Sequence, residues 1–320
     1  MKLKELFKFF VEQGIEKDPR GKKAVLDGLK EEKKRFDGLA GDEKKEYDLD
    51  RLSNPYLDSR ILCGDGGEEI KSIIAGIDME TPEILLASAL RSQGKKIDLV
   101  LTHHPEGKAY ATFYNVINMQ ADIFSKYGVP INIAESLTNS RMKEVGRKVM
   151  PQNHNRASDA ARLLGLPFMS AHTVADNHVA GYLQDLFDTQ KPRRLSGVMD
   201  ILKGIPEYQD AQRSGAGPVI FSGCKEDSAG KVFVDMTGGT EGPKEILEHL
   251  ADSGVGTIVG MHMSEEHYKD AEKHHIRVVI AGHISSDNLG LNLLFDSAEK
   301  KFGRIDFIEC SGFRRFSRRK

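Results

Sequence analysis

The sequence predicts an α/β protein of layered αβα architecture, with mostly parallel sheets in two α/β halves and an N-terminal helical extension. Two observations predict this class. Short apolar runs at residues 97–102, 167–171 and 276–282 are rich in β-branched residues and too short for helices, which is typical of buried parallel strands. Stretches with helical patterns alternate with these and other strand-like runs, as in βαβ units.

Composition narrows the class further. The chain has 320 residues, 39% of them apolar and 29% charged, with a formal net charge of −2. This balance is that of a soluble globular protein of about two domains, and it favours neither nucleic acid nor an anionic membrane as a partner. The three cysteines lie far apart, which argues against disulfides and a thiolate zinc site and indicates a reducing compartment. With no apolar stretch of bilayer length and no secretory signal, we expect a cytoplasmic protein without membrane contacts.

Changes in composition divide the chain into four regions. Residues 1–57 are dense in Lys, Glu and Asp and are predicted to form two or three charged helices on a larger body, at an oligomer contact or as a solvated face. Residues 58–190 and 191–313 form the two α/β halves, joined by a segment at 191–217 rich in Gly, Pro, Arg and Ser. Residues 314–320 form a basic tail, expected to be disordered.

The predicted elements of the first half begin with a strand at residues 72–78. Thr81 and Pro82 then open a helix that closes near Gly94, before the strand at 97–102. The remaining elements of this half are a helix at 116–127, a strand at 131–134, a short helix capped by Ser158 and the strand at 167–171.

The second half repeats this alternation of strands and helices. Pro243 is predicted to start a helix and Ser264 to cap another, which leads into the strand at 276–282. The other predicted strands are at 217–222, 231–236 and 255–259.

Metal-binding residue types follow three of the predicted strands. His103, His104 and Pro105 follow the strand at 97–102, and the proline ends that strand. Adjacent strand residues point to opposite faces, so both histidines serve one centre only where the strand ends. Such a pair can supply one ligand to each of two neighbouring ions, whereas two ordinary strand-end histidines are the alternative interpretation.

The other two strand ends each carry a histidine and an aspartate four residues apart. His172 and Asp176 follow the strand at 167–171, and His283 and Asp287 follow the strand at 276–282. A helical turn places each pair on one face. Because ligands gather beyond the carboxyl ends of parallel strands, the three motifs predict one centre with two ions of zinc, iron or manganese, which a carboxylate can bridge. His172 either binds metal or orients the loop.

These motifs resemble those of the NGG-one-interacting-factor-three-like family, also called GTP cyclohydrolase I type 2-like, over residues 75–312. The matching motifs are Thr-His-His-Pro at 102–105, His-Thr-x-x-Asp at 172–176 and Gly-His-x-x-Ser-Asp at 282–287. The resemblance implies a dinuclear metal centre, a toroidal hexamer and hydrolysis of a nucleotide such as GTP. It implies these metal ligands: His103, His104, Asp176, His283 and Asp287.

The chain departs from the family pattern in several places. Asp287 stands where the family has glutamate, so the carboxylate reaches less far. The family's Thr-Gly-Glu motif appears as residues 259–262, with His262, Glu265 or Glu266 as possible replacements for its glutamate. Residues 132–165 are longer than the corresponding segment of the family and are a candidate lid. The first 57 residues have no counterpart.

Further residues are weaker candidates. Glu106 and Glu265 are candidate catalytic acids or bases, with a solvated loop glutamate as the alternative for Glu106. His172, His178 and His262 are candidates for supporting the ligands. A glycine-rich turn before a helix is a candidate phosphate site, together with a nearby lysine. The candidate phosphate-binding residues are Gly238, Gly239, Thr240 and Lys108.

The sequence is compatible with two main functions. The first is a metal-dependent hydrolase acting on a small nucleotide. The second is a non-catalytic protein that stores, delivers or senses metal, or serves as a scaffold. A nucleic-acid clamp that uses the basic residues 313–320 is a third and weaker hypothesis, because the net charge is slightly negative.

Overall fold

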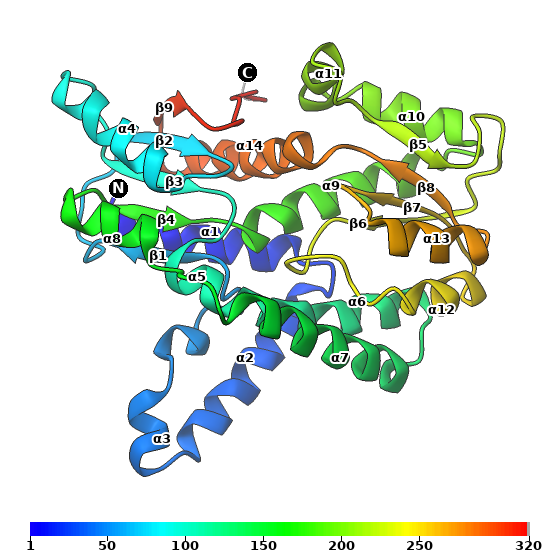
Figure 1. Ribbon diagram of the computed structural model, residues 1–320, viewed down its shortest axis with the longest axis horizontal. Helices are drawn as coiled ribbons and strands as arrows, with labels where there is room; N and C mark the ends of the chain where they lie inside the picture. The colour runs from blue at the N-terminus through cyan, green and yellow to red at the C-terminus, as the bar shows by residue number, and fades with distance from the viewer. Residues whose placement is uncertain (319–320) are drawn as a thin grey trace.

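The computed structural model describes residues 1–318 and contains two mostly parallel sheets (Figure 1). The first sheet has the strand order β1-β4-β3-β2-β9, in which only β1 is antiparallel to its neighbour. Its strands are β1 (Arg60–Cys63), β2 (Ser72–Gly76), β3 (Leu99–Thr102), β4 (Phe168–Ser170) and β9 (Asp306–Glu309). Strand β9 follows the whole second sheet in the sequence, so the chain returns to the first sheet at its end.

The second sheet has the same plan on a smaller scale. Its order is β5-β8-β7-β6, and β5 is the antiparallel edge strand. The strands are β5 (Val219–Ser222), β6 (Lys231–Asp235), β7 (Val255–Gly260) and β8 (Arg277–Ile280). The predicted parallel strands at 97–102, 167–171 and 276–282 are confirmed as β3, β4 and β8.

Helices cover both faces of each sheet, which confirms the layered αβα class (Figure 1). Two long helices, α9 (Thr173–Gln190) and α14 (His283–Phe302), pack against each other and contribute to the apolar cores beside both sheets. The outer face of the first sheet packs on α4 (Thr81–Ser92) and α8 (Arg156–Leu163). The outer face of the second sheet packs on α6 (Met119–Tyr127), α12 (Ile246–Asp252) and α13 (Glu265–Lys273).

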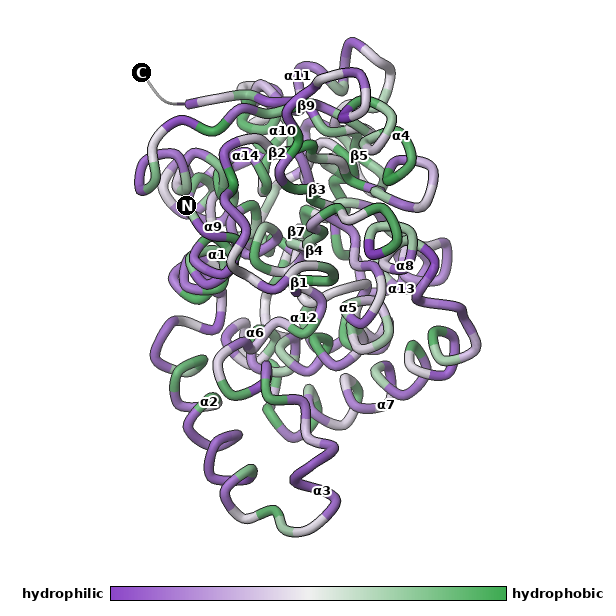
Figure 2. Tube along the Cα trace, turned by 90° about the vertical axis from the view of Figure 1, so that its left-hand side faces the viewer, coloured by the Kyte–Doolittle hydropathy of each residue, from purple (hydrophilic) through white to green (hydrophobic). Residues whose placement is uncertain are grey.

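The first 57 residues divide into a buried helix and an exposed pair. Helix α1 (Leu3–Lys17) buries Leu3, Leu6 and Phe10 in the core formed by the first sheet, α9 and α14. Helices α2 (Lys22–Asp37) and α3 (Gly41–Glu46), followed by the 3₁₀ turn η1 (Leu49–Leu52), extend from the body and are mostly hydrophilic (Figure 2). Helix α1 is therefore part of the core, whereas α2 and α3 have the solvated character that their charge predicts.

Two predicted elements are wrong. The strand expected at 131–134 is the start of helix α7 (Ile131–Val149), whose buried Ala134, Thr138 and Val145 follow helical spacing. Ser158 lies inside α8 and does not cap it. The expected junction at 191–217 contains α10 (Leu195–Lys203) and α11 (Pro206–Arg213). The remaining elements are α5 (Gly107–Thr112) and the 3₁₀ helix η2 (Phe113–Asn118).

The basic tail is also ordered as far as it is described. Phe313 is fully buried, Arg315 pairs with Asp296, and Arg318 pairs with the buried Glu207. The expectation of a disordered tail is therefore wrong for residues 314–318, because acidic groups of α14 and α11 bind its arginines, and residues 319 and 320 lie outside the described part. No helix within residues 1–318 is long and apolar enough to cross a membrane.

Candidate metal centre

The three motifs meet at the carboxyl ends of the parallel strands. His103 and His104 directly follow β3, and His172 lies between β4 and the first turn of α9, which carries Asp176. His283 begins α14 after β8, and Asp287 lies one turn further along that helix. The fold thus brings all the residues of the three motifs to one point between the two sheets.

Asp287 lies at the middle of this group. Its Oδ1 is 3.4 Å from His103 Nε2, while its Oδ2 is 3.5 Å from His104 Nε2 and 3.6 Å from His283 Nε2. Asp176 Oδ1 is also 3.4 Å from His103 Nε2. Asp287 therefore faces His103 with one carboxylate oxygen and faces His104 and His283 with the other.

The ring nitrogens of three histidines are oriented by acceptors behind them. His103 Nδ1 donates to the carbonyl oxygen of Ala171 at 3.1 Å, which leaves Nε2 to face the centre. His104 Nδ1 lies 2.6 Å from Asp78 Oδ1, and His172 Nδ1 lies 2.8 Å from Asp58 Oδ2. Such partners fix the orientation of metal-binding histidines in proteins. His172 Nε2 is 3.7 Å from Asp176 Oδ2, so this ring also faces the centre.

Four of the atoms that face the centre lack hydrogen-bond partners. Within residues 1–318, His103 Nε2, Asp176 Oδ1 and both carboxylate oxygens of Asp287 are buried and make no hydrogen bond. Leaving buried polar atoms unpaired is costly, and leaving buried charges unpaired costs more. Three sets of residues here place ligand atoms within 4.8 Å of one another: His103, Asp176 and Asp287; His104, His283 and Asp287; His103, His104 and His172. The donor set therefore fits divalent cations.

Electrostatics within the group agree with a cation site. Burial opposes a charge on His103, yet Asp287 and Asp176 hold its pKa well above the usual value. Burial likewise opposes protonation of His104, but the nearby Asp287 carboxylate and the hydrogen bond to Asp78 raise its pKa to about 9. The carboxylates thus create a site that attracts positive charge, from protons or from metal ions.

A cleft of about 420 Å³ leads to the exposed side of the centre. His104, His172 and His283 line this cleft, and so does Glu106. Burial and the neighbouring Glu80 carboxylate raise the pKa of Glu106 to about 7. Of the two predicted catalytic residues, Glu106 and Glu265, it is Glu106 that lines the cleft.

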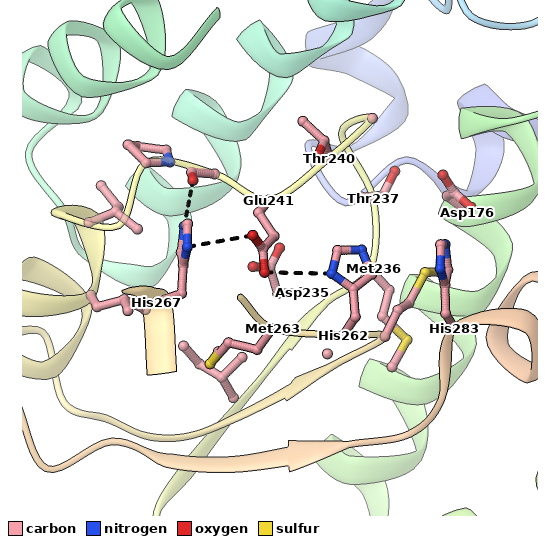
Figure 3. Close-up of a pocket in the computed structure, with 18 of the residues that line it drawn as sticks. Asp176, Asp235, Met236, Thr237, Thr240, Glu241, His262, Met263, His267 and His283 are labelled. Atoms are coloured by element: carbon pink, nitrogen blue, oxygen red, sulfur yellow. Dashed lines mark hydrogen bonds and ion pairs between the residues drawn. The ribbon is translucent and has the colours of Figure 1, made fainter. Parts of the chain in front are cut away.

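A second, smaller cavity of about 80 Å³ joins the centre to the end of the second sheet (Figure 3). In it, the Glu241 carboxylate lies 3.5 Å from His262 Nδ1 and 3.5 Å from His267 Nδ1. Burial opposes its charge, but these histidines and the Ser264 amide lower the pKa of Glu241 to about 2. The rings of His262 and His283 have centroids 4.8 Å apart and planes tilted at 60°, so His262 lies next to the centre.

Several predicted residues lie elsewhere. Glu265 is exposed and pairs with Lys269, and Lys108 pairs with Asp48; neither lines the cleft or the cavity. His178 is buried, and burial, with the Lys17 charge, lowers its pKa to about 3. It does not line the cleft or the cavity either.

The glycine-rich turn lies between the cleft and the cavity. Gly239 and Thr240 line both, but the following helix α12 begins only at Ile246. Gln120 donates to the carbonyl oxygens of Gly238 and Thr240 at 3.2 and 2.7 Å. A Cβ on Gly238 would lie 2.6 Å from the Gln120 side chain, so packing against Gln120 accounts for this glycine.

Sequence reasoning missed several residues of the site. Asp78 follows β2 as the histidines follow β3, so the same strand-end signal applies to it. Asp58 accepts hydrogen bonds from His172 Nδ1 and Thr173 Oγ1 but lies far away in the sequence, where no local pattern marks it. Tyr110 and Arg156 of the cleft wall were missed for the same reason.

The fold and the site together define a layered α/β protein with a candidate dinuclear metal centre. A NIF3 superfamily protein from Sphaerobacter thermophilus has a similar structure, with a TM-score of 0.68 and 25% sequence identity over 80% of this chain and 91% of that one. Reduced HcgD from Methanocaldococcus jannaschii matches with 18% identity over 78% and 88% of the chains and a TM-score of 0.46. TTHA1606 from Thermus thermophilus matches with 14% identity over 82% and 90% and a TM-score of 0.45.

No protein-family model and no curated protein sequence matches the chain. The similarity to the Sphaerobacter thermophilus protein covers most of both chains. This similarity confirms the resemblance to the NIF3-like proteins that the sequence indicated.

Proposed function

We propose that the protein is a hydrolase with two divalent metal ions that acts on a nucleotide. The arrangement of Asp287 carries this proposal, because its Oδ1 faces His103 while its Oδ2 faces His104 and His283. One ion would lie among His103, Asp176 and Asp287, and the other among His104, His283 and Asp287. Two ions so placed would supply the Lewis acidity that hydrolysis requires.

The residues around this pair have separate tasks in the proposal. Asp58, Asp78 and the Ala171 carbonyl hold the three histidine rings with Nε2 toward the centre. Glu106 lies in the cleft beside His104 and is assigned the transfer of protons to and from the substrate. His262 and Glu241 border the same space from the second sheet. The nucleotide enters through the cleft, which is large enough for a small ligand.

The alternative, a protein that stores or delivers metal, is favoured by one observation. The side chains of His103 and Asp176 are only 1% and 6% exposed, whereas those of His104 and His283 are 26% and 41% exposed. An ion held by the second pair would therefore exchange with solvent more readily. The cytoplasmic location and the toroidal hexamer remain predictions.

Turnover separates the two functions. Protein loaded with zinc, iron or manganese would be assayed on GTP and on a general phosphodiester, beside its Glu106→Gln and His104→Ala variants. If the protein is a hydrolase, the wild type should turn over substrate. Glu106→Gln should lose turnover but retain its metal. His104→Ala should have both less bound metal and less turnover. Bound metal without turnover on either substrate would contradict the hydrolase and favour metal handling.

A further inference from the structure

One wall of the cleft holds no candidate metal ligand. Residues 150–155, which connect α7 to α8, and Arg156, the first residue of α8, form this wall. Its lining side chains are Gln152, Asn153, His154 and Arg156, and they share the cleft with the candidate metal ligands His104 and His283. A molecule that fills the cleft from the centre would therefore contact this wall.

Arg156 is a cation without a protein partner. Its guanidinium makes no ion pair and no hydrogen bond within residues 1–318, although it lies close enough to Glu106 to affect that carboxyl. The other arginine of the same helix, Arg162, pairs with Asp159 at 3.1 Å and does not line the cleft. An unpaired guanidinium at a cleft suits an anionic group such as phosphate, which it binds through two parallel hydrogen bonds.

An aromatic surface adjoins Arg156. The rings of Tyr110 and Phe113 are nearly parallel, with centroids 5.5 Å apart and planes at 13°, and both line the cleft. His154 meets Tyr110 edge-on, with centroids 5.3 Å apart, and its buried Nδ1 has no hydrogen-bond partner within residues 1–318. Planar rings of ligands pack well against such aromatic groups.

We propose that this wall determines substrate specificity: Arg156 binds a phosphate of the substrate, and its planar base packs against Tyr110. The inference rests on the proposed function, because it assigns the parts of a nucleotide to particular residues of the cleft. The phosphate contact thereby falls to Arg156 and not to Lys108, which is already paired with Asp48 at 2.7 Å. Arg156 and Tyr110 come from segments that carry no metal ligand, so substrate specificity and metal binding can vary independently.

Calorimetric titration of the zinc-loaded protein with GTP and with guanosine tests this assignment. We expect Arg156→Gln to weaken GTP binding about 10-fold and to leave guanosine binding unchanged, because only GTP carries phosphate. Tyr110→Leu should weaken both ligands, whereas Tyr110→Phe keeps the ring and should weaken neither. Arg162→Gln is the matched control on the same helix and should bind both ligands as the wild type does.

Three results would overturn the proposal: unchanged GTP affinity in Arg156→Gln, an equal loss in Arg162→Gln, or no binding of GTP to the wild type. Turnover is read separately on the same samples. If GTP binds through Arg156 but is not hydrolysed, the proposed reaction fails and this assignment holds. If GTP is hydrolysed equally well with and without Arg156, the assignment fails and the reaction holds.

Discussion

Gly290 of α14 lies directly against the carbonyl oxygen of Ala175 in α9. A Cβ on Gly290 would be 2.5 Å from that oxygen, closer than any real contact. Asp176 follows Ala175, and Asp287 lies one turn before Gly290, so this helix contact sets the spacing of the two carboxylates that face His103. The close approach of α9 and α14 thus links core packing to the metal centre.

Gly290→Ala should lower the free energy of unfolding of the metal-free protein by about 1–3 kcal/mol, because the helices must separate. The same shift should weaken metal binding. Gly28→Ala is the control, since Gly28 is exposed in α2 with no atom within 4 Å of its Cβ position. This control should gain about 0.5–1 kcal/mol from helix propensity. Urea unfolding measures both variants, and equal stability of Gly290→Ala and the wild type would contradict the account.

Asp58→Ala should weaken metal binding about 10- to 100-fold, because His172 loses the acceptor that orients its ring. The Thr173 hydroxyl loses its acceptor as well, so some stability is lost too. Metal affinity would be measured by competition with a chromogenic chelator. Asp27→Ala, at a half-buried position paired with Lys30 and remote from the centre, is the control. Wild-type affinity in Asp58→Ala would show that the orientation of His172 does not matter for binding.

A chelator should remove the metal in two steps of about one equivalent each. The faster step belongs to the ion between His104 and His283, whose side chains are 26% and 41% exposed, and the slower to the ion beside the buried His103. Stopped-flow mixing with an excess of chelator would resolve them. Release of all the metal in a single exponential would count against two sites of different exposure.

Asp235→Asn should stabilise the protein above about pH 6. Burial is the main reason that the pKa of Asp235 is raised to about 6, with Glu241 adding to it and His267 and His262 opposing it. The folded state therefore binds this proton more tightly than the unfolded state, whose carboxyl has a pKa near 4. The resulting stability is complete at low pH and is lost as the pH rises from about 4 to 6.

The gain in Asp235→Asn should be about 1–3 kcal/mol at pH 7 and close to zero near pH 4, as measured by urea unfolding at both values. Asp210→Asn, at a position on α11 outside the cavity, should show no such dependence. A gain that is equal at both pH values would mean that the fold does not raise the pKa of Asp235.

Much of this site follows from local sequence. His103, His172 and His283 were found because each follows a short buried strand, and parallel strands place their carboxyl ends together. The helical spacing of His172 with Asp176 and of His283 with Asp287 placed both carboxylates correctly. These inferences need only the direction of a single strand and the residue spacing of a single helix.

The features that sequence reasoning missed depend on tertiary contacts. Asp58 reaches His172 across more than 100 residues, and Arg156 reaches the cleft only because α7 and α8 fold beside it. The apolar residues at 131–134 open helix α7 because Pro130 precedes them and the buried positions continue at helical spacing as far as Val149. Short apolar runs do not distinguish a strand from the start of a buried helix.

Metal stoichiometry tests the central claim most directly. Elemental analysis would compare the wild type, Asp287→Ala and Asp306→Ala after reconstitution with zinc, iron or manganese. Asp306 is exposed on β9 and serves as the control. We predict about two ions per chain in the wild type and in Asp306→Ala, and the loss of both ions in Asp287→Ala, because Asp287 faces both sites. A wild type without metal, or an Asp287→Ala variant that retains two ions, would contradict the account.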